Sequence, residues 1–114
     1  MNKKRVGIVG VGNVGATLAF TLATKDICSS ILLKDQRENI TQAMALDISQ
    51  ATNAANSKTV IYACLNDEEF NNCDVIVITA GVARKPGMSR DDLLLINAKI
   101  MTSVIKGIIP YNPN

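Results

Sequence analysis

Short apolar segments alternate along the chain with longer amphipathic segments, and this alternation predicts a repeated strand–helix pattern. Strands are expected where β-branched and other apolar residues run for about four to eight positions between turn residues. Helices are expected where apolar side chains recur every three or four positions. The predicted strands are Lys4–Gly10, Ile31–Lys34, Thr59–Leu65 and Asp74–Thr79. The predicted helices are Asn13–Lys25, Arg37–Ala51 and Ser89–Lys106.

The order of these elements indicates an α/β fold built on a parallel sheet, because strands that alternate with helices are joined by crossover connections. The segment Val75–Ile78 is apolar at every position, which suits a central strand covered on both faces. We therefore expect an incomplete doubly wound (Rossmann) sheet of about four strands with flanking helices. A complete sheet of this type has about six strands, so one edge should be bare and prone to association.

Each predicted helix has a stripe of apolar side chains that should face the sheet. The second helix is expected to give way to a polar loop over Thr52–Lys58, and Gly107 with Pro110 is expected to stop the third helix. Ser89, with Asp92 three positions later, is a variant of the capping box at the start of that helix. The stripes are Val14, Leu18 and Leu22, then Ile40, Met44 and Ile48, and last Leu93, Ile96, Ile100 and Val104.

Composition narrows the possible partners. The hydrophobic share is 47%, the charged share 19% and the net charge +2, which is expected of a soluble protein and offers no electrostatic attraction to nucleic acid. The uninterrupted apolar runs are too short to cross a membrane. The cysteines Cys28, Cys64 and Cys73 are odd in number and lack metal-site spacing, so we interpret them as reduced core residues of a cytoplasmic protein and expect no metal. The 114 residues contain no histidine, so no ready general base is available near neutral pH.

One glycine-rich motif follows the first predicted strand and opens the first predicted helix. Its residues are Gly10, Val11, Gly12, Asn13, Val14 and Gly15. The first glycine permits a tight turn, the second lets the backbone approach a pyrophosphate, and the third lets the helix pack on the sheet. The helix N-terminus would then favour the phosphates. The alternative is a glycine-rich turn that binds nothing.

Asp35 ends the second predicted strand, about 20 residues after the glycine motif. A carboxylate at this distance accepts the hydroxyls of an adenosine ribose and repels a 2′-phosphate, so we expect NAD rather than NADP. Lys34 and Arg37 flank it and could soften that repulsion. The alternative is a solvated acid at the end of a strand.

Further candidates follow the apolar strand. Thr79, Ala80 and Gly81 stand at its carboxyl end, where doubly wound sheets bind ligands, and small residues there let a ribose come close. Arg84 and Arg90 bracket a Pro-Gly loop, and two guanidinium groups could clamp a dicarboxylate. Asn97 lies seven positions after Arg90 and therefore on the same helix face. Plain turn residues, surface arginines and a solvated amide are the alternatives.

The segments Val9–Leu22, Ala45–Ala51 and especially Thr79–Leu93 resemble the lactate/malate dehydrogenase family. The resemblance implies that residues 1–114 form the N-terminal part of an NAD-binding Rossmann domain and that the catalytic domain lies outside them. It implies that Gly10–Gly15, Asp35 and Asn97 contact the cofactor and that Arg90 polarises the substrate carbonyl and binds its carboxylate. It also implies malate rather than lactate, because Arg84 stands where lactate dehydrogenases usually have Gln.

The expected function is therefore NAD-dependent oxidation of (S)-malate to oxaloacetate, by hydride transfer to the cofactor. The alternatives are part of an L-lactate or other 2-hydroxy-acid dehydrogenase, and a nucleotide-binding module without catalysis. The family also implies a homo-oligomer, a dimer or tetramer. The 114 residues alone are expected to show no turnover, since they lack the family's Asp–His proton relay.

Overall fold

Four parallel strands form the centre of the computed structural model, which describes residues 3–82 and 85–113. The sheet order is β3-β2-β1-β4, and every pairing is parallel. This confirms the predicted α/β doubly wound sheet. The elements in chain order are β1 (Arg5–Val9), α1 (Asn13–Thr24), β2 (Ser30–Lys34), α2 (Glu38–Ala54), β3 (Val60–Ala63), β4 (Val75–Ile78), α3 (Arg90–Ile108) and the 3₁₀ turn η1 (Ile109–Tyr111).

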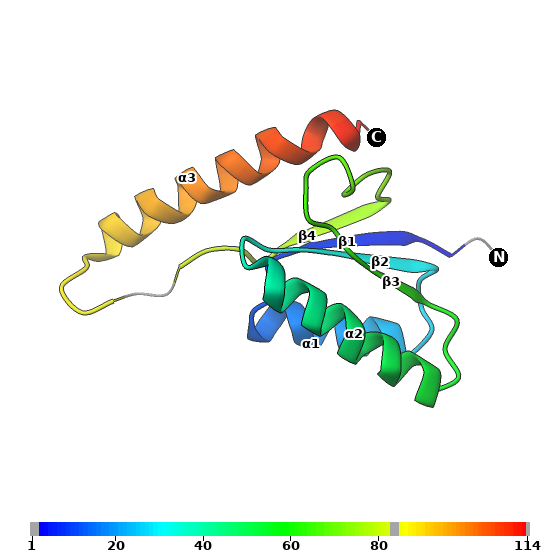
Figure 1. Cartoon of the computed structure of the whole chain (residues 1–114). Coiled ribbons are helices and arrows are strands. Elements are labelled where there is room, and N and C mark those ends of the chain that lie inside the picture. Colours follow the sequence, from blue (N-terminus) through cyan, green and yellow to red (C-terminus); the bar gives the residue numbers. More distant parts are fainter. Residues whose placement is uncertain (1–2, 83–84, 114) are drawn as a thin grey trace.

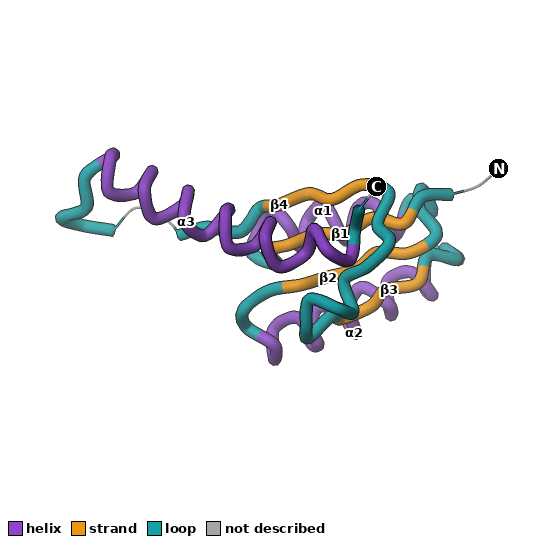
Figure 2. Tube along the Cα trace, turned by 90° about the horizontal axis from the view of Figure 1, so that it is seen from above, coloured by secondary structure: helices purple, strands orange, loops and turns teal. Residues whose placement is uncertain are grey.

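The sheet separates two layers of apolar side chains. Helices α1 and α2 cover one face, and the C-terminal part of α3 lies over the other, while the start of α3 extends beyond the sheet (Figures 1 and 2). The first core joins Val6, Ile8, Ile31 and Leu33 of the strands to Ala19, Ala23 and Ile48 of the helices. The second joins Val9 and Leu32 to Cys64, Phe70, Cys73 and Ile108. Alternate strand residues thus point to opposite faces, as the two-residue period requires.

Helix α1 packs on the sheet through small residues. Its buried positions are Gly15, Ala19 and Ala23, and Leu18 is only partly buried beside them. The prediction that Val14 belongs to the buried stripe is wrong, because its side chain is 70% exposed. Small side chains let the helix backbone approach the sheet closely. The buried face of α1 is therefore formed by these three small residues, each of which follows a residue of the predicted stripe by one position.

Helix α2 follows the predicted stripe in part. Ile48 is buried and Met44 packs against the core as predicted, whereas Ile40 is exposed and Thr41 and Ala45 are buried instead. The helix also continues to Ala54, through the first part of the expected polar loop. Thr52 is buried there, and its hydroxyl donates to the carbonyl oxygen of Ser49 at 2.7 Å. A polar side chain that bonds within its own helix is compatible with burial, so its polarity did not mark a loop.

Helix α3 begins as predicted and ends later than predicted. Ser89 accepts a hydrogen bond from the Asp92 N–H, and the Asp92 side chain accepts from the Ser89 N–H, which completes the capping box. At the other end the helix continues through Gly107 to Ile108. A Cβ atom at position 107 would lie 2.6 Å from Oδ2 of Asp67. Gly107 therefore allows α3 to pack against the turn after β3 and does not stop the helix.

The β4 strand is an edge of the described sheet, and its residues are half-buried or exposed. Its apolar sequence suggested a central strand, yet β2 is the more deeply buried strand. Among the described residues, β4 pairs with β1 alone, so its other side has no strand partner within them. All three cysteines are buried and free, which confirms their place in the core.

One helix, Arg90–Tyr111 in the described part of the chain, is long and apolar enough to cross a membrane by length and composition alone. Its most apolar window of 18 residues has a mean hydropathy of 1.5. The sequence predicted that no apolar segment is long enough to cross a membrane. That prediction considered only uninterrupted apolar runs, and this helix corrects it. A single helix of this kind is weak evidence for a membrane span, and Lys99 and Lys106 interrupt its apolar surface.

Candidate dinucleotide-binding site

The glycine motif forms the turn between β1 and α1, at the carboxyl end of the sheet (Figure 1). Gly10 has φ of +103°, and its N–H donates to the Lys34 carbonyl oxygen at 2.8 Å. Helix α1 then starts at Asn13, with Gly12 as its N-cap. No side chain caps this helix, and its first turn contains no acid. The amide groups at its N-terminus are therefore available to an anion.

The three glycines of the motif have different physical roles. Gly10 adopts a left-handed conformation, which side chains disfavour. A Cβ atom on Gly15 would collide with the carbonyl oxygen of Gly10 and lie 2.9 Å from Oγ1 of Thr79. A Cβ atom on Gly12 would meet nothing within 4 Å, so that position borders open space. The first and third glycines shape the turn, and the second leaves room above the helix N-terminus.

Asp35 follows β2 and reaches across to the glycine motif. Its Oδ2 accepts the Val11 N–H at 2.7 Å and Nη2 of Arg37 at 3.0 Å. Its Oδ1 accepts the backbone N–H and Nε of Arg37, both at 3.0 Å. The side chain of Asp35 is 11% exposed and that of Arg37 is 53% exposed. The carboxylate is thus held beside the turn by two backbone donors and covered from the solvent side by a guanidinium.

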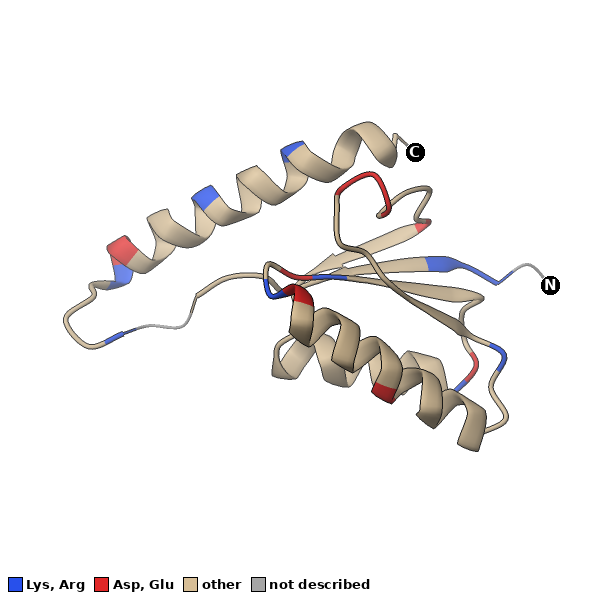
Figure 3. Cartoon of the chain, viewed as in Figure 1, with Lys and Arg blue, Asp and Glu red and all other residues tan. Residues whose placement is uncertain are grey.

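These contacts keep Asp35 ionised. Hydrogen bonding to the Arg37 side chain lowers the pKa of the Asp35 carboxyl far below its ordinary value, and this effect exceeds the opposing effect of burial. The backbone bonds from Val11 and Arg37 lower the pKa further. The same ion pair raises the pKa of Arg37. Figure 3 shows acidic and basic segments side by side between the end of β2 and the start of α2.

Thr79 ties the end of β4 to the same turn. Its N–H donates to the Val9 carbonyl oxygen at 2.7 Å, and its hydroxyl donates to the Gly10 carbonyl oxygen at 3.0 Å. The hydroxyl of Thr79 is therefore used to position the glycine motif. The interpretation of Thr79 as a small residue that only makes room for a ribose missed this contact. Ala80 follows it and is half-buried.

Asn97 of α3 holds the segment that follows β4. Its Oδ1 accepts the Val82 N–H at 2.8 Å, and its Nδ2 donates to the Val82 carbonyl oxygen at 3.3 Å. A Cβ atom on Gly81 would lie 3.0 Å from the same Oδ1. The amide of Asn97 thus acts as a clamp on the backbone, a role that its spacing from Arg90 did not reveal.

The candidate substrate residues lie apart from this cluster. Arg90 opens α3 at the end that extends away from the sheet in Figure 1, and its side chain has no ion pair with the described residues. Arg84 lies outside the described residues. A shallow pocket of about 560 Å³ lies between the neighbouring loop and α3. Its lining residues are Lys85, Pro86, Gly87, Met88, Asp92, Leu95, Ile96 and Lys99.

The arrangement fits a dinucleotide and offers no metal site among the described residues. Space above Gly12, an uncapped helix N-terminus and an ionised carboxylate lie together at one edge of the sheet. These are the groups needed for a pyrophosphate and a ribose. The structure thus brings together Gly10–Gly15, Asp35 and Thr79, whereas Asn97 and Arg90 belong to the helix on the other face. Arg37 was expected only as a flanking charge, and its two side-chain hydrogen bonds to Asp35 have no signal in the sequence.

Comparisons with known proteins identify the same domain. The family model for the lactate/malate dehydrogenase NAD-binding domain matches residues 4–114. A malate dehydrogenase of Aliarcobacter butzleri is 66% identical over all of this chain, which covers 36% of that protein. A malate dehydrogenase of Sulfurimonas denitrificans is 50% identical over 97% of this chain, which covers 35% of that protein. The chain thus spans about a third of the length of these curated relatives.

Solved structures agree with the sequence relatives. Malate dehydrogenase from Archaeoglobus fulgidus, in complex with NADH, has a TM-score of 0.89 and 35% identity. The match covers 96% of this chain and 37% of that one. Lactate dehydrogenases are also among the solved structures with this fold. The chain belongs to the lactate/malate dehydrogenase family, its residues 4–114 match the NAD-binding domain of that family, and NAD is the cofactor of that domain.

Proposed function

We propose that this chain provides the adenosine and pyrophosphate side of the NAD site in a malate dehydrogenase, which interconverts (S)-malate and oxaloacetate. The observation that supports this proposal is the contact of Asp35 with the Val11 N–H, which holds the carboxylate beside an uncapped helix N-terminus. The 66% identity to a malate dehydrogenase supports malate over other 2-hydroxy acids.

The residues of the chain have distinct tasks in this proposal. Amide groups at the start of α1 bind the pyrophosphate, and Asp35 accepts the hydroxyls of the adenosine ribose. The Ala80-Gly81 segment forms the wall next to them, and Asn97 keeps one N–H of its amide for a cofactor atom while it clamps Val82. NAD, when bound, supplies the hydride acceptor.

The substrate side of the proposal depends on two arginines. Arg90 is exposed at the start of α3, so its guanidinium is accessible to a carboxylate and a carbonyl oxygen. Arg84 would bind the second carboxylate of a dicarboxylate. Lys85 and Lys99 line the neighbouring pocket and add positive charge there.

The substrate can be tested by exchanging one keto acid for another. We expect the enzyme that contains this chain to oxidise NADH with oxaloacetate at a kcat/KM at least tenfold above that with pyruvate. The measurement is the loss of NADH absorbance with each keto acid under matched conditions. The substitution Arg84→Gln should reduce that preference by about 100-fold, since it removes a charged partner worth about 2–3 kcal/mol. Preference of the wild-type enzyme for pyruvate would instead support the lactate dehydrogenase alternative.

We further propose a cytoplasmic homo-oligomer that acts on small molecules and has no nucleic-acid or membrane partner. The net charge of +2 supports the absence of nucleic acid. Exposed apolar side chains on α2 and α3, such as Leu46 and Leu94, support association. A monomeric mass by light scattering would contradict the oligomer.

A further inference from the structure

The carboxylate of Asp35 has no free acceptor position in this structure. A carboxylate offers about four hydrogen-bond positions, two on each oxygen. Val11 and Arg37 fill all four of them, at distances of 2.7 to 3.0 Å. A ribose diol that donates two hydrogen bonds to Asp35 therefore has to displace two of the existing donors.

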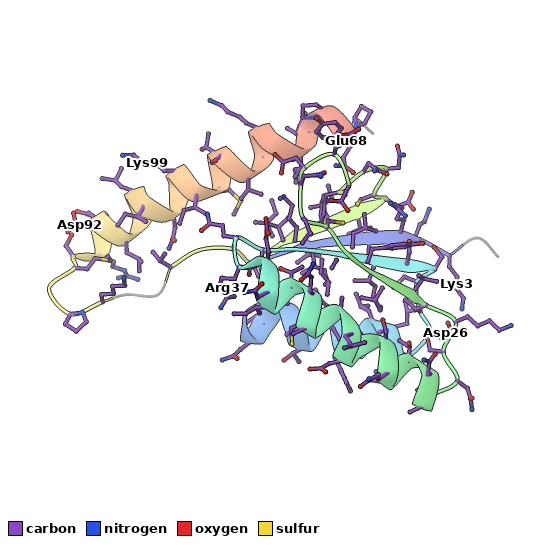
Figure 4. All side chains as sticks on the ribbon, viewed as in Figure 1. Lys3, Asp26, Arg37, Glu68, Asp92 and Lys99 are labelled. Atoms are coloured by element: carbon purple, nitrogen blue, oxygen red, sulfur yellow. The ribbon has the colours of Figure 1, made fainter. Side chains whose placement is uncertain are left out.

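The four donors differ in how easily they can leave. The N–H groups of Val11 and Arg37 belong to the backbone at the ends of β1 and β2, so the fold holds them in place. The other two belong to the Arg37 guanidinium, whose side chain is 53% exposed. Figure 4 shows Arg37 at the surface, beside the start of α2. The guanidinium is thus the group that a ribose can replace.

We propose that Arg37 occupies the ribose position of Asp35 when the cofactor is absent, leaves it when the cofactor binds, and then weakens the discrimination against a 2′-phosphate. The inference rests on the proposed NAD site. The guanidinium donates one hydrogen bond to each carboxylate oxygen, as the two hydroxyls of a ribose would do. It therefore competes with NAD and remains close enough to pair with a 2′-phosphate.

The other charges near Asp35 do not replace Arg37 in this role. The Lys34 ammonium forms an ion pair with Asp67 at 3.1 Å, and its side chain is only 20% exposed. Glu38 opens α2 and is negative, so it would repel a phosphate. The guanidinium of Arg37 is therefore the positive group best placed to offset the repulsion between Asp35 and a 2′-phosphate.

The test compares two ligands that differ only at the 2′ position. ADP-ribose and 2′-phospho-ADP-ribose are titrated calorimetrically into the protein and into the Arg37→Gln variant. Removal of the competing guanidinium should lower the Kd for ADP-ribose about threefold, because an exposed ion pair contributes less than about 1 kcal/mol. The Kd for the 2′-phosphorylated ligand should rise. The Kd for this ligand divided by the Kd for ADP-ribose should therefore increase about tenfold.

A second variant separates competition from charge. The substitution Arg37→Lys keeps the positive charge but cannot form the two-pronged contact with the carboxylate. We expect it to bind ADP-ribose more tightly than the wild type and to retain most of the affinity for the 2′-phosphorylated ligand. The matched control is Lys58→Gln, which removes the same charge just before β3, at the opposite end of the sheet. It should leave both Kd values unchanged.

Three results would overturn the inference. An unchanged Kd ratio in Arg37→Gln would show that the guanidinium has no effect on specificity. Weaker ADP-ribose binding in both Arg37 variants would show that Arg37 supports the ribose site instead of competing for it. If the wild type bound neither ligand while unfolding cooperatively in urea, the proposed NAD site itself would be wrong, and the inference with it.

Discussion

At the scale of single residues, Gly12 and Gly15 are only three positions apart but have different surroundings. Gly15 is buried against the Gly10 carbonyl oxygen, whereas Gly12 borders open space. The same added methyl group should therefore affect folding at one position and binding at the other.

We expect Gly15→Ala to lower the free energy of unfolding by about 1–3 kcal/mol, because its Cβ atom would collide with backbone that cannot move freely. Gly12→Ala should change the same quantity by less than about 1 kcal/mol, since Gly12 has an ordinary φ of −80° and nothing lies within 4 Å. Urea unfolding of the two variants gives both values.

Binding should follow the opposite order. Gly12→Ala places a methyl group where the pyrophosphate approaches, so ADP-ribose affinity should fall more than tenfold in a protein of normal stability. Normal ADP-ribose binding by Gly12→Ala would contradict the proposed position of the phosphates. A Gly15→Ala variant as stable as the wild type would show that the turn adapts to the added methyl group.

Sequence patterns located the site residues but not their contacts. The spacing of Asp35 from the glycine motif predicted a carboxylate close to that motif, and Asp35 does accept the Val11 N–H at 2.7 Å; its binding of a ribose stays a prediction. The hydrogen bond from Val11 and the cover provided by Arg37 depend on side-chain conformation at the ends of two strands. No periodicity records such conformations, so these contacts could not be predicted.

In helix α3, one end depends on contacts between neighbouring residues and the other packs against a distant segment of the chain. Its start depends on the Ser89–Asp92 capping box, which joins residues three positions apart and is visible in the sequence. Near its end, Gly107 lets the helix pack against Asp67, which is far away in the sequence, and the helix continues through this glycine to Ile108. The start was therefore predicted correctly and the end was not.

At the scale of elements, we predict that Asn97 couples α3 to the segment after β4. Asn97→Ala removes both hydrogen bonds to Val82, worth about 1 kcal/mol each. Amide hydrogen exchange at Val82 should become at least fivefold faster. Exchange is the better measurement, because alanine also favours the helix by about 0.5 kcal/mol and masks part of the loss in stability.

Two controls accompany this measurement. Asn97→Asp keeps an oxygen that can accept the Val82 N–H, so it should preserve most of the protection at that amide. Ser103→Ala alters an exposed side chain on the same helix and should leave Val82 unchanged. If Asn97→Ala exchanged at the wild-type rate, the clamp would have no energetic importance.

At the scale of the whole molecule, the sheet collects the ends of β1, β2 and β4 at one edge (Figure 1). The glycine turn, Asp35 and Thr79 follow these three strands, and hydrogen bonds connect them there. This edge offers binding groups but no histidine, since the 114 residues contain none.

We therefore predict that the 114 residues alone bind ADP-ribose but do not oxidise malate. They lack the imidazole, which is the side chain that most often accepts such a proton near neutral pH. NADH formation from NAD and malate, followed by absorbance, should stay at the level of a protein-free sample. A full-length malate dehydrogenase serves as the positive control, and malate-dependent NADH formation by the 114 residues would refute the prediction.

The sequence by itself determined the order of strands and helices, the parallel sheet, the place of the glycine motif and the start of α3. Each of these depends on periodicity or on bonds between residues a few positions apart. Only the tertiary structure decided which helix faces are buried, where α2 and α3 end, and how Asp35 is bonded. These features arise from contacts between segments far apart in the chain. Small side chains stand where these segments approach each other closely.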